Sequence, residues 1–165
     1  MKPSELKQFE RSTCACGKCK AGCKSMPGRL ASGDLDAIAN FFGVDPGNEE
    51  FTQRNFRSLD DWKVGEEPVT IPTIVPAQKE SGRCVFLTKD DRCSIHPVAP
   101  FGCRNFDACG ENEVDDVYKS ICQLAVITHS RDYLMTWGHL HTLGIQAPPI
   151  GLRKAAMHAE LDRLR

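Results

Sequence analysis

Cysteine placement constrains this chain more than any other feature of its sequence. Nine of the 165 residues are cysteine, and eight of these lie in two short segments, residues 14–23 and 84–109. The stretch between the segments, about sixty residues long, contains none. Because clustered thiolates are typical metal ligands, we predict that eight cysteine side chains bind metal. They are Cys14, Cys16, Cys19, Cys23, Cys84, Cys93, Cys103 and Cys109.

Disulfides are the first alternative use of so much cysteine. Disulfide frameworks belong mainly to small secreted chains, which begin with an apolar signal segment. The first ten residues here are charged and contain no such segment, and an odd number of cysteines would leave one thiol unpaired. A chain of this length also buries a core without covalent cross-links. We therefore favour metal binding, and interpret the ninth cysteine, Cys122, as a packed thiol.

Overall composition excludes several classes of protein. A net charge of -1, with 41% hydrophobic and 26% charged residues, is typical of a soluble globular domain. No apolar stretch approaches the roughly 20 residues that span a membrane. A nucleic-acid-binding domain is usually strongly basic, and this chain is not. We expect one cytoplasmic domain of bacterial type over residues 1–165, with no membrane or nucleic-acid partner.

Positive charge is nevertheless concentrated near the cysteines. Residues 1–29 contain seven Lys or Arg and two Glu, and Arg83, Arg92 and Arg104 each adjoin a cysteine of the second segment. Cationic neighbours lower the pKa of a thiol and offset the charge of a thiolate-ligated centre. A solvated basic face is the alternative explanation for residues 1–29, and both stay open.

Local patterns before residue 83 predict little regular structure. Apolar residues at helical spacing predict a short helix from residue 34 to 42, with Ser32 or Asp34 as its cap and Gly43 at its end. Four prolines between residues 44 and 82 predict an irregular, extended segment. Within it we expect one helix at about 48–57 and a lone edge strand at 69–71.

The second half predicts a hairpin followed by helices. Residues 84–87 and 92–95 flank a polar four-residue turn, as in a β-hairpin, and the prolines after His96 turn the chain toward Cys103. Helices are expected at about 112–125, 131–143 and 151–164. Leu134, Trp137 and Leu140 should face inward in the second of these, and Gly144 should close it. The predicted fold class is α+β, mostly α with a small β-hairpin and long irregular loops. It comprises a metal-binding region at 14–109 and a helical C-terminal segment at 112–165.

Cysteine spacing favours an iron–sulfur cluster over zinc. Structural zinc sites usually present two C-x2-C pairs, and only Cys16 and Cys19 have that spacing here. The second segment spaces its cysteines by nine, ten and six positions. A cluster spreads its ligands over several iron atoms and accepts looser spacing.

The same residues resemble a known family. Cys16-Gly-Lys-Cys19 together with Cys84-Val-Phe-Leu, Cys93-Ser-Ile-His and Pro-Phe-Gly-Cys103-Arg resembles the CxxCxxCC, or YkgJ-like, cysteine cluster family, described as a zinc- or iron-chelating domain. The resemblance covers roughly residues 14–104 and implies metal chelation. Some relatives resemble lysine methylases with a cluster, but this chain has no glycine-rich nucleotide motif to support that activity.

Three departures from the family pattern bear on the ligand set. Lys20 stands where the family has a second adjacent cysteine, so Cys23 would supply that ligand and Cys14 the first one. His96 replaces a tyrosine and Ala99 an arginine, which concerns packing or charge more than coordination.

Eight sulfur ligands suffice for two four-sulfur sites, or for one site with reserve thiols. A centre shared between the two segments would couple metal binding to folding, whereas two local sites would not, and both arrangements stay open. Histidines add little, since His139 and His141 are two positions apart and point in different directions on a helix. His96 either tunes or replaces a ligand, or only ends the hairpin.

Three functions agree with these observations. The leading one is a cysteine-ligated iron–sulfur protein in electron transfer, redox sensing or an accessory role, with a protein or redox partner. The others are a structural zinc module that docks a protein partner, and a metal chaperone. A freestanding enzyme ranks below these, because the sequence offers no Ser/His/Asp set, paired carboxylates or phosphate loop.

Overall fold

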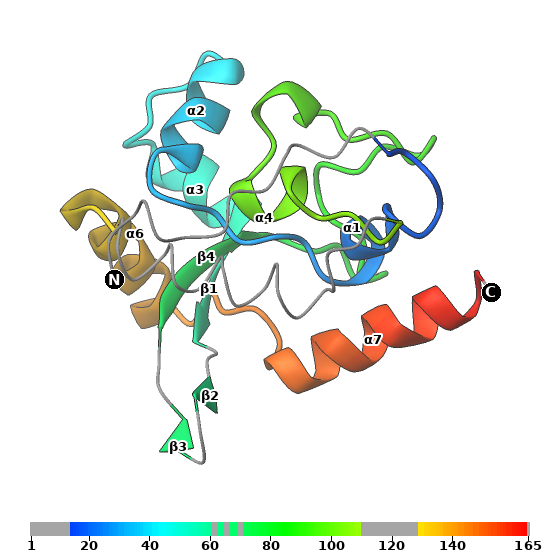
Figure 1. Ribbon diagram of the computed structural model, residues 1–165. Helices are drawn as coiled ribbons and strands as arrows, with labels where there is room; N and C mark the ends of the chain where they lie inside the picture. The colour runs from blue at the N-terminus through cyan, green and yellow to red at the C-terminus, as the bar shows by residue number, and fades with distance from the viewer. Residues whose placement is uncertain (1–13, 61–62, 65–66, 69–70, 110–128, 165) are drawn as a thin grey trace, which may run out of the picture.

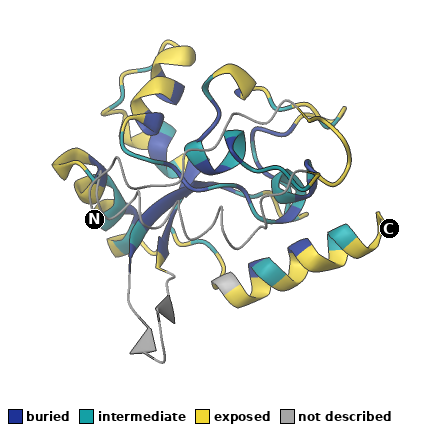
Figure 2. Ribbon diagram, in the orientation of Figure 1, coloured by how far each residue is buried: buried dark blue, intermediate teal, exposed yellow. Residues whose placement is uncertain are grey.

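A short antiparallel sheet lies at the centre of the molecule (Figure 1). The computed structural model describes residues 14–60, 63–64, 67–68, 71–109 and 129–164. Strand β1 (Phe56–Asp60) pairs with β4 (Pro72–Pro76), with Ser58 opposite Ile74. A second small ribbon, β2 (Lys63–Val64) with β3 (Glu67–Pro68), is also antiparallel. Most residues of β1 and β4 are buried (Figure 2).

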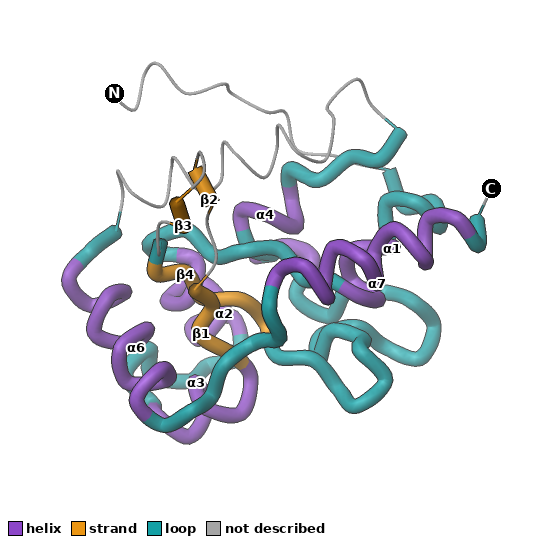
Figure 3. The backbone as a smooth tube through the Cα atoms, turned by 90° about the horizontal axis from the view of Figure 1, so that it is seen from below, coloured by secondary structure: helices purple, strands orange, loops and turns teal. Residues whose placement is uncertain are grey.

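Short helices surround this sheet. They are α1 (Ala21–Ser25), α2 (Asp34–Phe41), α3 (Glu49–Asn55), the 3-10 helix η2 (His96–Val98), α4 (Phe101–Arg104), α6 (Arg131–Thr142) and α7 (Ile150–Asp162). Helix α6 packs on β1 and β4, and α7 lies along α1 (Figure 3). The predicted α+β class is confirmed. None of the helices in the described ranges has the length and apolar character needed to cross a bilayer.

One apolar core joins the sheet to the cysteine-rich half. Phe56, Ile74, Ile95 and Leu140 are fully buried in it, and the buried Cys84 belongs to the same cluster. The buried Tyr133 hydroxyl makes two hydrogen bonds in this core. It accepts from the Ile74 N–H at 2.7 Å and donates to the Leu30 carbonyl at 2.9 Å. A buried phenol with both partners satisfied holds three chain segments in one geometry.

Helix boundaries follow the local signals. Helix α2 begins at Asp34 and ends before Gly43, whose φ of +67° favours glycine. Its cap residue is Gly33, so neither predicted side-chain cap forms. Helix α3 lies inside the predicted range, and the Asn48 side chain accepts from the Phe51 N–H at 2.8 Å. Helix α7 also agrees with its prediction.

The predicted hairpin at 84–95 is wrong in its regular part. Only isolated bridges form there, between Leu87 and Cys93 and between Gln78 and Cys84. The turn is tight, with Asp91 in the left-handed region at φ +56°, and it gives way to η2 soon afterwards. The predicted turn is present, but residues 84–95 are too short and too curved to form two regular strands.

The regular hairpin lies in the stretch predicted to be irregular. Strands β1 and β4 stand at the two ends of residues 56–76 and pair with each other. Pro72 and Pro76 are the first and last residues of β4. Proline lacks an N–H and is tolerated at strand ends, so it does not exclude this strand. Residues 69–70 of the predicted edge strand at 69–71 lie outside the described residues, and Ile71 directly precedes β4 without belonging to a strand.

Helix α6 faces the core at two of the three predicted positions, because Leu140 is buried and Trp137 packs against the core. The prediction is wrong for Leu134, which is 41% exposed. The buried Tyr133 takes its place in the inward stripe. Gly144, with φ +71°, follows the helix as expected. The helix predicted at 112–125, together with Cys122, lies outside the described residues.

Asp34 joins α2 to α4, and its loss should be costly. Its buried carboxylate accepts from the N–H groups of Ala31 and Phe101 at 2.8 and 2.7 Å, and from Arg104 at 2.8 Å. We expect Asp34→Ala to lower the free energy of unfolding by about 3 kcal/mol, because two backbone donors and one guanidinium lose their acceptor. Urea unfolding would measure this. Asp36→Ala, which removes an exposed carboxylate from the same helical turn, should change it by less than about 0.5 kcal/mol.

Candidate metal centre

Four cysteines form a compact group, here called the outer quartet: Cys14, Cys16, Cys19 and Cys109. Their sulfur atoms all lie within 4.8 Å of one another, and the Sγ atoms of Cys16 and Cys109 are 3.3 Å apart. The first three come from the turns before α1, and Cys109 follows α4. Four soft donors at this spacing are a complete ligand set for a metal ion.

Backbone and carboxylate contacts hold the outer quartet together. A turn closes through the Lys20 N–H, which donates to the Cys16 carbonyl at 3.1 Å. Asp107 accepts from the Cys109 N–H at 2.8 Å and from the Cys19 thiol at 3.4 Å. Asp107 therefore links the two chain segments beside the sulfur atoms. Sequence reasoning did not single out this residue.

Protons are distributed unevenly over the outer quartet. The pKa of Cys16 is lowered to about 6, because the Cys19 backbone N–H and the Cys109 thiol stabilise its thiolate. Burial raises the pKa of Cys19 well above its usual value, and the hydrogen bond to Cys16 raises that of Cys109. Cys14, Cys16 and Cys109 are exposed. One accessible thiolate is thus present at neutral pH before any metal binds.

The other four cysteines of the two segments are here called the inner quartet: Cys23, Cys84, Cys93 and Cys103. Cys84 donates its N–H to the Cys23 carbonyl at 2.8 Å, and Cys103 accepts from the Gly28 N–H at 3.2 Å. Cys23, Cys93 and Cys103 line a cavity of about 410 Å³, which Cys14 and Cys19 also line. Among the described residues, only the outer quartet has four ligand atoms within 4.8 Å.

Burial raises the pKa of three inner thiols, those of Cys23, Cys84 and Cys103. It raises the pKa of Cys23 to about 11 and that of Cys84 to about 12. Cys103 is raised well above its usual pKa by burial, with further contributions from the charges of Cys23 and Cys84. These couplings show that the inner sulfur atoms lie within electrostatic range of one another. Such thiols bind a soft metal only as their protons leave.

Each quartet contains cysteines from both segments. Cys109 lies with the three cysteines of residues 14–19, whereas Cys23 lies with the remaining three of the second segment. The arrangement corresponds to neither a division by segment nor a single compact group. Both quartets therefore connect parts of the chain that are far apart in sequence.

A close approach of two glycines positions Cys103. Gly102 donates to the Arg29 carbonyl at 2.9 Å, and a Cβ atom on Gly28 would lie 2.3 Å from the Gly102 carbonyl carbon. The same Cβ would lie 2.9 Å from the Cys103 sulfur. Only glycine fits between these two backbones. In the sequence, Gly28 follows a proline and Gly102 precedes a cysteine. This pattern did not by itself predict that the two glycines meet.

Cationic groups border the cavity, in agreement with the charge pattern. Lys20, Arg92 and Arg104 line it together with Asp91. Arg83 instead forms an ion pair with Asp91, and this contact, with one from Lys24, holds the pKa of Asp91 below its usual value. The expected positive charge is thus partly neutralised.

The histidines take separate positions. His139 lies 3.8 Å from Glu49, and His141 lies 3.1 Å from Asp60, so their different directions agree with the two-residue spacing. His96 is exposed and lines the same cavity as the inner thiols. Its role as a ligand remains a hypothesis.

Comparison with protein families agrees with this geometry. The family model named CxxCxxCC, described as "putative zinc- or iron-chelating domain", matches residues 15–123. It begins after Cys14 and extends past Cys109, beyond the stretch in which the motifs were recognised. A search of curated proteins and a search of solved structures gave no match. Because the match spans more than half of the sequence, the chain belongs to the CxxCxxCC family of zinc- or iron-chelating domains.

Proposed function

We propose that the protein is a two-centre metalloprotein. The outer quartet binds a single zinc ion, and the inner quartet binds an iron–sulfur cluster that serves a redox or accessory role with a protein partner. The observation that carries this proposal is the different packing of the two sets of sulfur atoms. The four outer sulfur atoms lie within 4.8 Å of one another, whereas three of the four inner cysteines line a cavity of about 410 Å³.

The outer spacing suits one tetrahedral ion. Zinc bonds thiolate sulfur at about 2.3 Å, which puts the four sulfur atoms about 3.8 Å apart. An iron–sulfur cluster needs ligating sulfurs farther apart, because iron and sulfide atoms lie between them. The outer quartet therefore needs only small adjustments to hold zinc.

The inner quartet has the features that a cluster requires. None of its thiols is exposed, Cys84 is buried, and the adjoining cavity has far more room than one ion needs. Lys20, Arg92 and Arg104 at the cavity would offset the negative charge of thiolate ligands. Burial and nearby charge are the main factors by which a protein sets a cluster's reduction potential.

Zinc in both quartets is the second candidate, with a structural role. It is supported by the hydrogen bond from the Cys84 N–H to the Cys23 carbonyl and by the electrostatic effect of Cys23 on Cys103. An ion bound by these residues would cross-link the two cysteine segments. The metal would then stabilise the fold, and function would reside in whatever partner the helices bind.

Metal and acid-labile sulfide content distinguish these candidates. Protein purified without air should contain one zinc ion per chain, together with iron and sulfide. Its absorption spectrum should show a broad band at roughly 400 nm. Two zinc ions without sulfide or colour would replace the leading proposal by the structural one. Protein that contains neither zinc nor iron in stoichiometric amounts would contradict metal binding as the function.

Inner-quartet affinity should depend steeply on pH. The raised pKa values of Cys23, Cys84 and Cys103 mean that these thiols are protonated at pH 7 without metal, so binding releases three protons. For each unit by which the pH is lowered, the affinity for metal should weaken about tenfold per released proton. For three protons this is about 1,000-fold per pH unit.

Cobalt(II) titrations of Cys109→Ser against a competing chelator would measure this dependence for the inner quartet alone. The reciprocal variant, Cys84→Ser, provides the comparison for the outer quartet. Its dependence should be shallower, because Cys16, with a pKa of about 6, is already ionised at pH 7. Equal, shallow dependences would contradict the assignment of buried protonated thiols to metal binding.

A further inference from the structure

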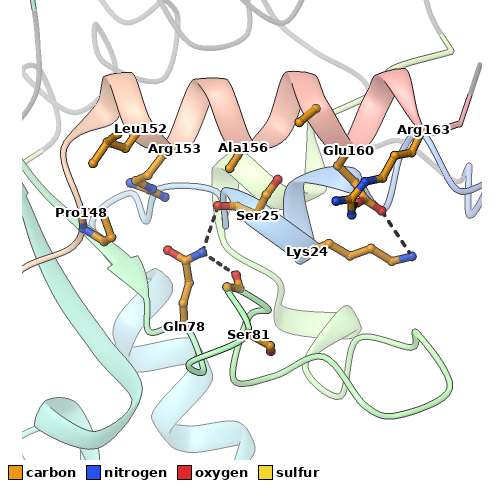
Figure 4. Close-up of a pocket in the computed structure, with 12 residues that line it drawn as sticks. Lys24, Ser25, Gln78, Ser81, Pro148, Leu152, Arg153, Ala156, Glu160 and Arg163 are labelled. Atoms are coloured by element: carbon orange, nitrogen blue, oxygen red, sulfur yellow. Dashed lines mark hydrogen bonds and ion pairs between the residues drawn. The ribbon is translucent and has the colours of Figure 1, made fainter.

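A second cavity, of about 400 Å³, borders α1 and α7 (Figure 4). None of the eight described cysteines lines it. Its walls come from α1, from the loop around Gln78 and from one face of α7. Pockets of this volume are large enough for a small metabolite.

Positive charge predominates in this cavity. Lys24, Arg153 and Arg163 line it, with Glu160 as the single carboxylate among its lining residues. Arg153 is only 2% exposed, and its Nη2 donates to the Pro27 carbonyl at 3.0 Å. An arginine remains charged when buried, and its planar fork matches carboxylate and phosphate groups. Its placement in a cavity with more cations than anions favours an anionic ligand.

Existing ion pairs in the cavity are weak enough to be exchanged. Lys24 lies 3.1 Å from Asp91, but its contact with Glu160 is 3.8 Å long. Arg163 lies 3.4 Å from Glu160, and its side chain is 78% exposed. The pair formed by the exposed Arg163 contributes little, and the contact of the part-buried Lys24 with Glu160 is near the upper limit for an ion pair. A ligand anion can therefore take the place of Glu160 beside Lys24 at low cost.

The remaining walls define the shape and polarity of the ligand. Gln78 is fixed by donating to the Ser25 and Gly82 carbonyls, so its amide forms a rigid polar floor (Figure 4). Leu152 and Ala156 provide an apolar wall along α7, opposite this floor. A ligand with one charged end and a short apolar body satisfies both surfaces.

We propose that this cavity binds a small organic anion, a carboxylate or phosphate ester with a short apolar body, independently of the metal centres. The head group contacts Arg153 and Lys24, and the apolar body lies against Leu152 and Ala156. Carboxylates and phosphate esters share this chemistry, and the choice of probes separates them.

The test uses the full chain with its metal bound, at constant ionic strength. Hexyl phosphate, hexanoate and inorganic phosphate serve as probes, and binding is followed by calorimetry and by amide chemical shifts of α1 and α7. We expect saturable binding of hexyl phosphate or hexanoate, about tenfold tighter than inorganic phosphate because the alkyl chain is buried. The tighter of the two alkyl probes identifies the head group. Absence of saturable binding by all three at about 10 mM would overturn the proposal.

A matched pair of variants locates the site without disturbing the buried arginine. Ala156→Trp fills the cavity from an exposed helical position, whereas Ala155→Trp puts the same side chain on α7 outside the lining residues. Ala156→Trp should weaken binding of the better alkyl probe by about tenfold or more, and Ala155→Trp by less than about twofold. Equal affinities in the two variants would overturn the assignment. Metal content should be unchanged in both, which separates this result from any failure of the two-centre proposal.

Discussion

Cys109→Ser is expected to release one metal ion per chain and to leave the other centre loaded. Cys109 is the only member of the outer quartet from the second cysteine segment, and its sulfur lies 3.3 Å from that of Cys16. Serine oxygen is a poor ligand for a soft ion, so the remaining three thiols lose affinity. Loss of a structural ion costs several kcal/mol, which lowers the melting temperature by about 10 °C or more in a chain of this size. Metal analysis and thermal unfolding of the same sample would measure both effects.

Two further variants complete this experiment. Cys84→Ser should have the reciprocal effect, with loss of the inner centre and retention of zinc. Cys122→Ser, predicted from the sequence to remove only a packed thiol, should retain all metal. If Cys109→Ser and Cys84→Ser each released every metal ion, the eight cysteines would form one interdependent centre, and the two-centre proposal would be wrong.

Gly28→Ala should be about as damaging as loss of a ligand. The added Cβ would lie 2.3 Å from the Gly102 carbonyl carbon and 2.4 Å from the Cys103 nitrogen, and neither backbone atom can move without displacing α4. The two segments would separate, and the Gly28 N–H, 3.2 Å from the Cys103 sulfur, would move away from it. We expect a loss of about 3–5 kcal/mol in unfolding free energy and loss of metal from the inner quartet. Urea unfolding with parallel metal analysis would measure both.

Gly138→Ala is the matched control for this substitution. Gly138 lies within α6, and a Cβ there has nothing within 4 Å. Alanine favours a helix interior over glycine, so this variant should be more stable by about 0.5–1 kcal/mol and retain its metal. Full metal content and wild-type stability in Gly28→Ala would show that the two backbones can part without affecting Cys103.

Local features of the fold were predictable because their causes are local. Asn48 caps α3 with its own side chain, and Gly43 ends α2 in a conformation that other residues avoid. The pairing of β1 with β4 was not predictable, because it depends on contacts between residues far apart in sequence. Helix α6 turns Tyr133 inward because its hydroxyl finds partners on Ile74 and Leu30, which no periodicity could show.

The ligands were predictable as a set but not in their grouping. Cys19 and Cys23 are four positions apart, a spacing that suggests one site, but α1 begins at Ala21 and separates them. Cys19 precedes the helix and joins the outer quartet, whereas Cys23 lies within it and joins the inner one. Helix α4 separates Cys103 from Cys109 in a similar way, since the chain turns after Arg104. Spacing alone cannot reveal where a short helix begins.

The mixed origin of the outer quartet also sets the order in which its cysteines appear during synthesis. Cys109 follows Cys16 by 93 residues. At about 5–20 residues per second, a ribosome adds those residues in roughly 5–20 s. During that interval Cys14, Cys16 and Cys19 are three thiols that still lack the fourth member of their quartet. The outer quartet is therefore completed only after all four cysteines of the inner quartet have been synthesised.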